Sequence, residues 1–184
     1  MKNHWYLVSS LPVLRLGEKP AMSVDTFRAA CVGHLSEDEC LAVEAVLETR
    51  EPEAGGTPAV RWWNREVQLR DAVVRVRAKT RGTDATPFLK PYVGFSVAIE
   101  KQVVDAFSRP NPLEQELVLD RARWVLADEL ALTAPFGFPG VLAFAIKVRI
   151  AERWAELDEE TGKEKVEELI LSATAEDIET GIKL

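Results

Sequence analysis

Long apolar runs, which would mark membrane-spanning segments, are missing from this sequence. No stretch of eighteen consecutive apolar residues occurs in the 184 residues, and the longest apolar run, residues 141–146, makes only about one and a half helical turns. We therefore expect no direct membrane insertion. The N-terminal residues Met-Lys-Asn-His-Trp-Tyr-Leu-Val form too short an apolar core for a secretory signal, so we expect a cytoplasmic location.

Cysteine and histidine are scarce, with two residues of each kind. Cys31 and Cys40 fall on the apolar side of predicted helices, where a reduced thiol packs as a small core residue, so no disulfide is expected. His34 follows Cys31 by three residues, a spacing that a zinc site could use. A fourth soft ligand at metal-site spacing is missing, and His4 would have to come from the N-terminal arm. We therefore expect neither a metal nor a cofactor.

Common motifs for phosphate binding and nucleophilic catalysis are also missing. The sequence contains no GxxxxGK[ST], GxGxxG or GxSxG pattern, which are the patterns that cradle phosphates or expose a nucleophilic serine. Carboxylates such as Asp128 and Glu129, or the run 158–160, are surface charges unless a pocket shifts their pKa. We predict that the protein is not an enzyme. An active site without a known motif is the remaining alternative.

The residues that are present indicate a folded globular protein, with 47% hydrophobic and 29% charged residues. The net charge is −7, yet segment 61–82 carries seven Arg and Lys against only Glu66 and Asp71, which leaves −12 on the other residues. Charge is therefore strongly segregated along the chain. Residues 1–184 are enough for one hydrophobic core, so we expect a single domain.

Apolar residues at helical spacing predict an all-α domain of six or seven helices. Prolines and a glycine among the first residues predict an extended arm or short strand over 1–22. Ser36 and Glu39 form a capping-box pattern at the start of one helix. The acidic C-terminal part, residues 158–184, is expected to pack less tightly. The predicted helices run from Ser23 to Gly33, from Ser36 onward, over 60–80, over 95–107, from an Asn111 cap to 132, and from Pro139 onward.

The helix over 60–80 carries the basic residues and is the predicted binding element. Tryptophans in this and later helices fall in amphipathic patterns, which favours a core role over base stacking. Glu66 with Arg70 and Asp71 with Arg75 lie within helical reach of each other. The remaining positive charge is expected to face acidic protein, either in this chain or in a partner. The candidate partner-binding residues are Arg61, Arg65, Arg70, Arg75, Arg77 and Lys79.

A nucleic-acid-binding module that uses the same helix is the alternative function. Such modules are normally basic overall, because each neutralised phosphate adds affinity and acidic surface repels the backbone. The net charge of −7 therefore favours a protein partner. A steep loss of binding as salt rises would identify the nucleic-acid binder.

Several sequence segments resemble those of an uncharacterised bacterial family whose genes accompany V-type ATPase subunit genes. The segments are WYLVSSLPVLRLGEKPAMSVDTFRAAC, RWWNREVQLRDAVVRVRA, NPLEQELVLDRARWVLADEL and ERW at 152–154. That family is remotely similar to the C/d subunit of V- and A-type ATPases, where an LRxxxR-type helix is comparable to Leu69, Arg70 and Arg75. The resemblance implies an all-helical, non-catalytic adaptor for ion transport, acting as a stalk or rotor-cap component or an assembly factor. Its implied partners are the central stalk or rotor ring, which would place it at the membrane periphery.

Overall fold

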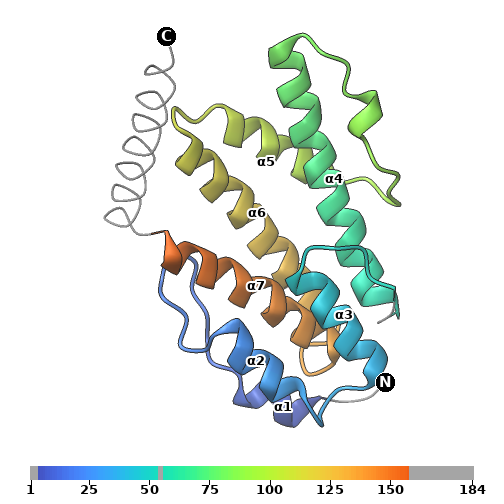
Figure 1. Cartoon of the computed structure of the whole chain (residues 1–184), viewed down its shortest axis with the longest axis vertical. Coiled ribbons are helices and arrows are strands. Elements are labelled where there is room, and N and C mark those ends of the chain that lie inside the picture. The colour runs from blue at the N-terminus through green and yellow to red at the C-terminus, as the bar shows by residue number, and fades with distance from the viewer. Residues whose placement is uncertain (1–3, 54–55, 158–184) are drawn as a thin grey trace, which may run out of the picture.

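Helices make up the architecture seen in a computed structural model, which describes residues 4–53 and 56–157 (Figure 1). Within these ranges there is no strand, so the predicted all-α class is confirmed. The expectation for residues 158–184 lies outside the described residues. The elements are α1 (Trp5–Ser10), α2 (Val24–Cys31), α3 (Glu37–Leu47), α4 (Gly56–Arg81), the 3-10 turn η1 (Thr86–Phe88), α5 (Val97–Phe107), α6 (Pro112–Leu132) and α7 (Phe138–Glu156).

Local capping residues set the start of three helices, as the sequence predicts. The hydroxyl of Ser23 accepts a hydrogen bond from a backbone amide in the first turn of α2. At α3 the capping box is complete, because the Ser36 amide donates to the Glu39 carboxylate at 2.8 Å and the Glu39 amide donates back to Ser36. Asn111 caps α6 through its side-chain oxygen. Each cap satisfies a backbone donor that the helix itself cannot pair.

The N-terminal arm is partly helical, which differs from the extended conformation predicted for residues 1–22. Trp5–Ser10 form α1, whereas residues 11–22 contain no helix or strand. Leu7 is buried, and Val8 and Leu11 pack against the neighbouring core. Their spacing of three and four residues matches one face of a helix, so burial of this face stabilises a short helix despite the prolines that follow.

Packing divides the helices into two groups (Figure 1). Helix α7 contacts α1, α2, α3, α4 and α6, so it lies at the centre of the first group. Helices α4, α5 and α6 pack on one another and form the second group. Helices α4 and α6 therefore belong to both groups and connect them.

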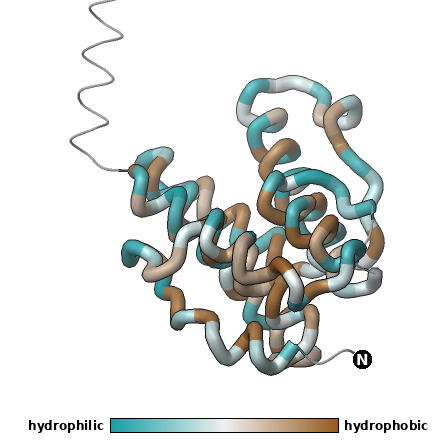
Figure 2. Tube along the Cα trace, turned by 60° about the horizontal axis from the view of Figure 1, so that its bottom comes forward, coloured by the Kyte–Doolittle hydropathy of each residue, from teal (hydrophilic) through white to brown (hydrophobic). Residues whose placement is uncertain are grey.

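Two hydrophobic clusters match these two groups. The first cluster includes Phe27, Trp62 and Leu142, and the second includes Leu69 and Ile99. Hydrophobic and hydrophilic residues alternate along the helices, as amphipathic packing requires (Figure 2). Trp124 and Trp154 pack against the first cluster, which confirms their predicted core role. Leu126 is the partly buried residue that packs against both clusters.

The loop between α4 and α5, residues 82–96, is attached along one side of α4. Three polar side chains of α4 make this attachment by bonding to backbone groups of the loop. Asn64 accepts from the amide of Val93 at 2.7 Å, Gln68 bonds to both the amide and the carbonyl of Ser96, and Asp71 accepts from the amide of Lys90. The loop therefore covers part of the helix predicted to bind a partner.

Candidate functional site

Helix α4 does not present its six predicted binding residues on one surface. With 3.6 residues per turn, they fall on two roughly opposite faces of the helix. The first face holds Arg61, Arg65, Arg75 and Lys79, and the second holds Arg70 and Arg77. The six residues therefore do not form one continuous site.

Two of the six predicted residues are engaged within the chain. Arg70 donates from Nε to Oε1 of Glu66 at 2.8 Å, which confirms the pair expected from their spacing. Arg75 donates to Glu100 of α5 at 3.1 Å, and Asp71, its expected partner, bonds to the loop backbone instead. The packing of α5 on α4 brings Glu100 within reach of Arg75. Both cations therefore serve internal pairing in addition to any external role.

Three other predicted residues are exposed. Arg61, Arg77 and Lys79 reach the surface, and none of them forms an ion pair within residues 4–53 and 56–157. The guanidinium of Arg77 lies over the ring of Phe107, 5.8 Å from the ring centre. These side chains can meet an acidic partner without breaking an internal ion pair.

A groove of about 600 Å³, which we call the α4–α6 groove, contains Arg61 and Arg65. Arg65 is half-buried, and its Nη1 atom is buried without a hydrogen-bond partner in the described part of the chain. A buried donor without a partner is destabilising, because it loses its hydration without compensation. Apolar walls come from Val60, Trp62, Val93, Leu126 and Leu130, and Glu129 of α6 also lines the groove.

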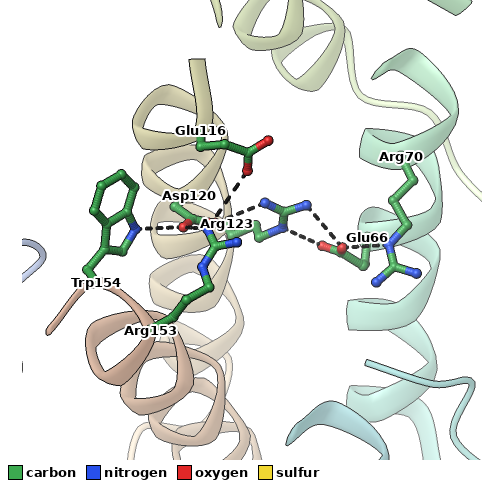
Figure 3. Close-up of polar contacts among 7 residues, drawn as sticks. All are labelled: Glu66, Arg70, Glu116, Asp120, Arg123, Arg153 and Trp154. Carbon is green, nitrogen blue, oxygen red and sulfur yellow. Dashed lines mark hydrogen bonds and ion pairs between the residues drawn. The ribbon is translucent and has the colours of Figure 1, made fainter. Parts of the chain in front are cut away.

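A second polar feature, which we call the charge cluster, consists of Glu66, Asp120, Arg123, Arg153 and Trp154 (Figure 3). Arg123 of α6 donates to the Glu66 carboxylate of α4 from Nε at 3.0 Å and from Nη2 at 3.3 Å. Its Nη1 donates to Asp120 at 2.9 Å. The side chains of Glu66, Asp120 and Arg123 are only 1%, 2% and 13% exposed, so these ion pairs are buried.

Helix α7 completes the charge cluster through Asp120. The indole Nε1 of Trp154 donates to Asp120 at 2.7 Å, and Arg153 donates to the same carboxylate oxygen. Arg153 also lies 3.8 Å from the carboxylate of Glu116 at the edge of the cluster (Figure 3). The cluster therefore ties α4, α6 and α7 together.

Within the cluster, Glu66 and Arg123 hold each other in their charged forms. Burial raises the pKa of Glu66, but the charge of Arg123 and its hydrogen bonds outweigh burial, so the pKa lies below its usual range. Burial lowers the pKa of Arg123, but the charges and hydrogen bonds of Glu66 and Asp120 together outweigh burial, so that pKa is raised. Removing either partner would leave the other charge buried and uncompensated.

The charge cluster was not predicted from the sequence, although two of its helices carry a signal for it. Glu66 falls in the apolar row that contains Trp62, Leu69 and Val73. Asp120 lies at helical spacing from the apolar residues Leu117, Trp124 and Ala127 on α6. A single charged residue inside an apolar row is buried when the row is buried, so it needs a partner from another element.

Metal binding and membrane spanning have no structural support in the described residues. No group of three or more His, Cys, Asp and Glu side chains in these ranges is arranged to hold a metal ion. No helix within 4–53 and 56–157 is long and apolar enough to cross a bilayer.

The described residues thus define an all-helical protein with a basic helix, an arginine-containing groove and a buried charge cluster. A family model described as protein of unknown function (DUF2764) matches residues 96–176. The match includes α5, α6 and α7, and therefore Asp120, Arg123 and Arg153, but not α4. Neither the curated proteins nor the solved structures include a match to this chain.

Proposed function

We propose that this protein is a non-catalytic adaptor that binds an acidic segment of a V-type ATPase subunit through the α4–α6 groove. The observation that supports this proposal most is the buried Nη1 of Arg65, which has no hydrogen-bond partner in the described part of the chain. Arg65 also lines the groove and is only half-buried, so a partner's carboxylate would pair with the accessible part of its guanidinium through a charge-assisted hydrogen bond. Arg61, exposed in the same groove, would add a second cation for an acidic segment.

The groove suits a peptide segment with mixed chemistry. Its volume of about 600 Å³ and its apolar walls can bury one or two hydrophobic side chains of a partner. The two arginines would fix the position of that segment, because charged contacts add specificity to apolar burial. The expected ligand is therefore an acidic residue beside an apolar one.

Exposed apolar side chains in the segment that follows α4 also support a protein partner. Five large apolar side chains between residues 88 and 104 are each more than half exposed. Clusters of exposed apolar residues often mark sites of protein association. Val93, one of the five, also lines the groove. The five residues are Phe88, Val93, Phe95, Val97 and Val104.

The identity of the partner rests on the sequence resemblance described above. A rotor or stalk component needs a docking surface rather than a catalytic centre. The segregated charge of the chain, with +5 in segment 61–82 within a net charge of −7, is compatible with docking to an acidic subunit. The expected partners are subunits of the central stalk or the rotor ring.

A nucleic-acid ligand has less support. Arg70 and Arg75 are paired with Glu66 and Glu100, so fewer cations remain for phosphates than the sequence suggests. The acidic remainder of the chain would repel a nucleic-acid backbone. An electrophoretic shift that disappears steeply with salt would favour this alternative over the proposed function.

The proposed function can be tested with a groove variant, Arg61→Glu with Arg65→Met, and a control, Arg15→Glu with Lys19→Met. Both variants change the net charge by the same amount, and the control changes exposed residues of the N-terminal arm. We expect the groove variant to bind purified V-type ATPase more weakly, on the order of tenfold or more, while the control binds like the original protein. Circular dichroism should show equal helicity in both. Equal binding by the two variants would contradict the proposal.

A further inference from the structure

A second cavity, of about 400 Å³, borders the charge cluster. It lies where the end of α3 meets α4, α6 and α7, away from the α4–α6 groove. Four arginines and three carboxylates contribute to its lining, which gives the lining a formal charge of +1. The arginines are Arg70, Arg123, Arg149 and Arg153.

Two of the three carboxylates each accept three hydrogen bonds from side chains of this chain. Glu66 accepts hydrogen bonds from Arg70 and Arg123. Asp120 accepts from Arg123, Arg153 and Trp154. The third carboxylate, Glu116, lies at the edge, with 41% of its side chain exposed. The buried negative charge of the cavity is therefore committed to internal partners.

Arg149 of α7 is the cation of this cavity that lacks a partner. It is half-buried, and within the described residues it forms neither a hydrogen bond nor an ion pair, unlike Arg70, Arg123 and Arg153. Burial lowers the pKa of Arg149; Glu66 acts against this effect, and the charge of Arg123 adds to it. A partly buried cation beside other cations destabilises a fold unless an anion compensates it.

The surplus of donors in this cavity matches an oxyanion. Arg149 offers its whole guanidinium fork, and Arg70 uses only Nε towards Glu66. Guanidinium groups bind phosphate oxygens with two parallel hydrogen bonds, and several such groups can surround one phosphate. A carboxylate has only two acceptor oxygens and would use fewer of these donors.

Thr49 adds a hydroxyl-bearing residue to the same lining and has an unusual backbone. Its φ of +60° makes it the one non-glycine residue with positive φ in the described ranges. This conformation closes α3, because the amide of Thr49 donates to the carbonyl of Val46 at 3.2 Å and the amide of Arg50 donates to Ala45 at 2.9 Å, as in a common helix C-cap. The cap places Thr49 beside the arginines of the cavity.

We infer that this cavity binds a small phosphate-bearing anion, with Arg149 as its main ligand and Arg70, Arg153 and Thr49 as further contacts. The volume accommodates a phosphate and a small attached group. This cavity is separate from the adaptor groove, so its ligand does not depend on the proposed function.

The test is thermal unfolding of the full chain in inorganic phosphate and in sodium chloride of equal ionic strength. A third sample with glycerol 1-phosphate distinguishes a free phosphate ion from a phosphate monoester. We expect phosphate or the monoester to raise the melting temperature in a saturating manner, as a ligand of the folded state does. The compound that binds more tightly, inorganic phosphate or glycerol 1-phosphate, identifies the source of the phosphate group. No rise with either compound would overturn the inference.

Arg149→Met separates the site from a general salt effect, with Arg121→Met on the exposed face of α6 as the control. Because Arg149 has no internal partner in the described residues, we expect Arg149→Met to unfold in chloride at the same or a higher temperature than the original protein, and to lose the response to phosphate. Arg121→Met should keep that response. Lower stability of Arg149→Met in chloride, or an undiminished response, would also overturn the inference.

Discussion

Arg123 of α6 and Glu66 of α4 form a buried pair with two hydrogen bonds, at 3.0 and 3.3 Å, although 57 positions separate them in the sequence. Arg123 also contacts Asp120, which in turn contacts α7. One guanidinium group therefore links two carboxylates from different helices. Its loss should affect the stability of the whole bundle.

We expect Arg123→Met to destabilise the protein by about 3–5 kcal/mol, because it leaves the buried carboxylate of Glu66 with Arg70 as its remaining cation. Urea unfolding followed by circular dichroism measures this loss. The double variant Glu66→Met with Arg123→Met should lose less than the sum of the single variants, since it leaves no unpaired charge from this pair. A loss below about 1 kcal/mol in the single variant would show that the pair is replaceable.

Acid should weaken the start of α3 through Glu39. Burial raises the pKa of this carboxyl, but the amide of Ser36 and the ring of His4 outweigh burial and hold it below the usual value of 4.5. Because the folded pKa is the lower one, this contribution is complete above pH 4.5 and is lost as the pH falls through the folded value. Unfolding free energies measured from pH 7 downward should therefore decrease less in Glu39→Gln than in the original protein. Identical pH profiles would contradict this role.

Gly140→Ala should destabilise the first turn of α7. A Cβ atom at this position would lie 2.1 Å from the carbonyl oxygen of Pro135 and 3.0 Å from its carbonyl carbon, and backbone cannot move aside as a side chain can. We expect a loss of about 3 kcal/mol in chemical denaturation. Gly82→Ala is the control, because its φ of +66° adds strain but no atom lies within 4 Å, and it should lose about 1 kcal/mol. Equal losses would argue against the close contact.

Cys31 should resist thiol reagents in the folded protein. Burial raises its pKa to about 12, with smaller contributions from Cys40 and Glu44, so the reactive thiolate is rare at pH 8. Cys40 is only partly buried and should react first. In the variant Cys40→Ser, labelling of Cys31 by a chromogenic disulfide should be slow in buffer and fast in urea. Similar rates in both solutions would show that the thiol is accessible.

Features whose interacting residues lie close together in the sequence could be predicted. The cap of α3 joins Ser36 to Glu39, and the pair of Arg70 with Glu66 spans one helical turn. Both depend on helix geometry alone, so spacing is enough to find them. The all-α class follows from apolar residues at helical spacing in several segments.

Features that depend on how helices meet could not be predicted in the same way. Helical spacing pairs Arg75 with Asp71, one turn away, but the packing of α5 brings Glu100 to Arg75 instead. The burial of α1 against the core likewise depends on distant residues, and it outweighs the prolines after it. Residue spacing could not predict the charge cluster for the same reason, because the cluster forms only where α4, α6 and α7 meet.

The charge cluster also fixes how α4 and α6 are aligned. On α4, Glu66 falls between Trp62 of the first hydrophobic cluster and Leu69 of the second, and on α6 Arg123 falls between Ala122 of the second and Ala127 of the first. Sliding one helix past the other by a single turn would place these charges against apolar side chains. Burying unpaired charges costs free energy, whereas purely apolar contacts would tolerate such a shift. The same alignment sets Arg65 opposite the α6 wall of its groove, so charges buried away from the groove help to determine its shape.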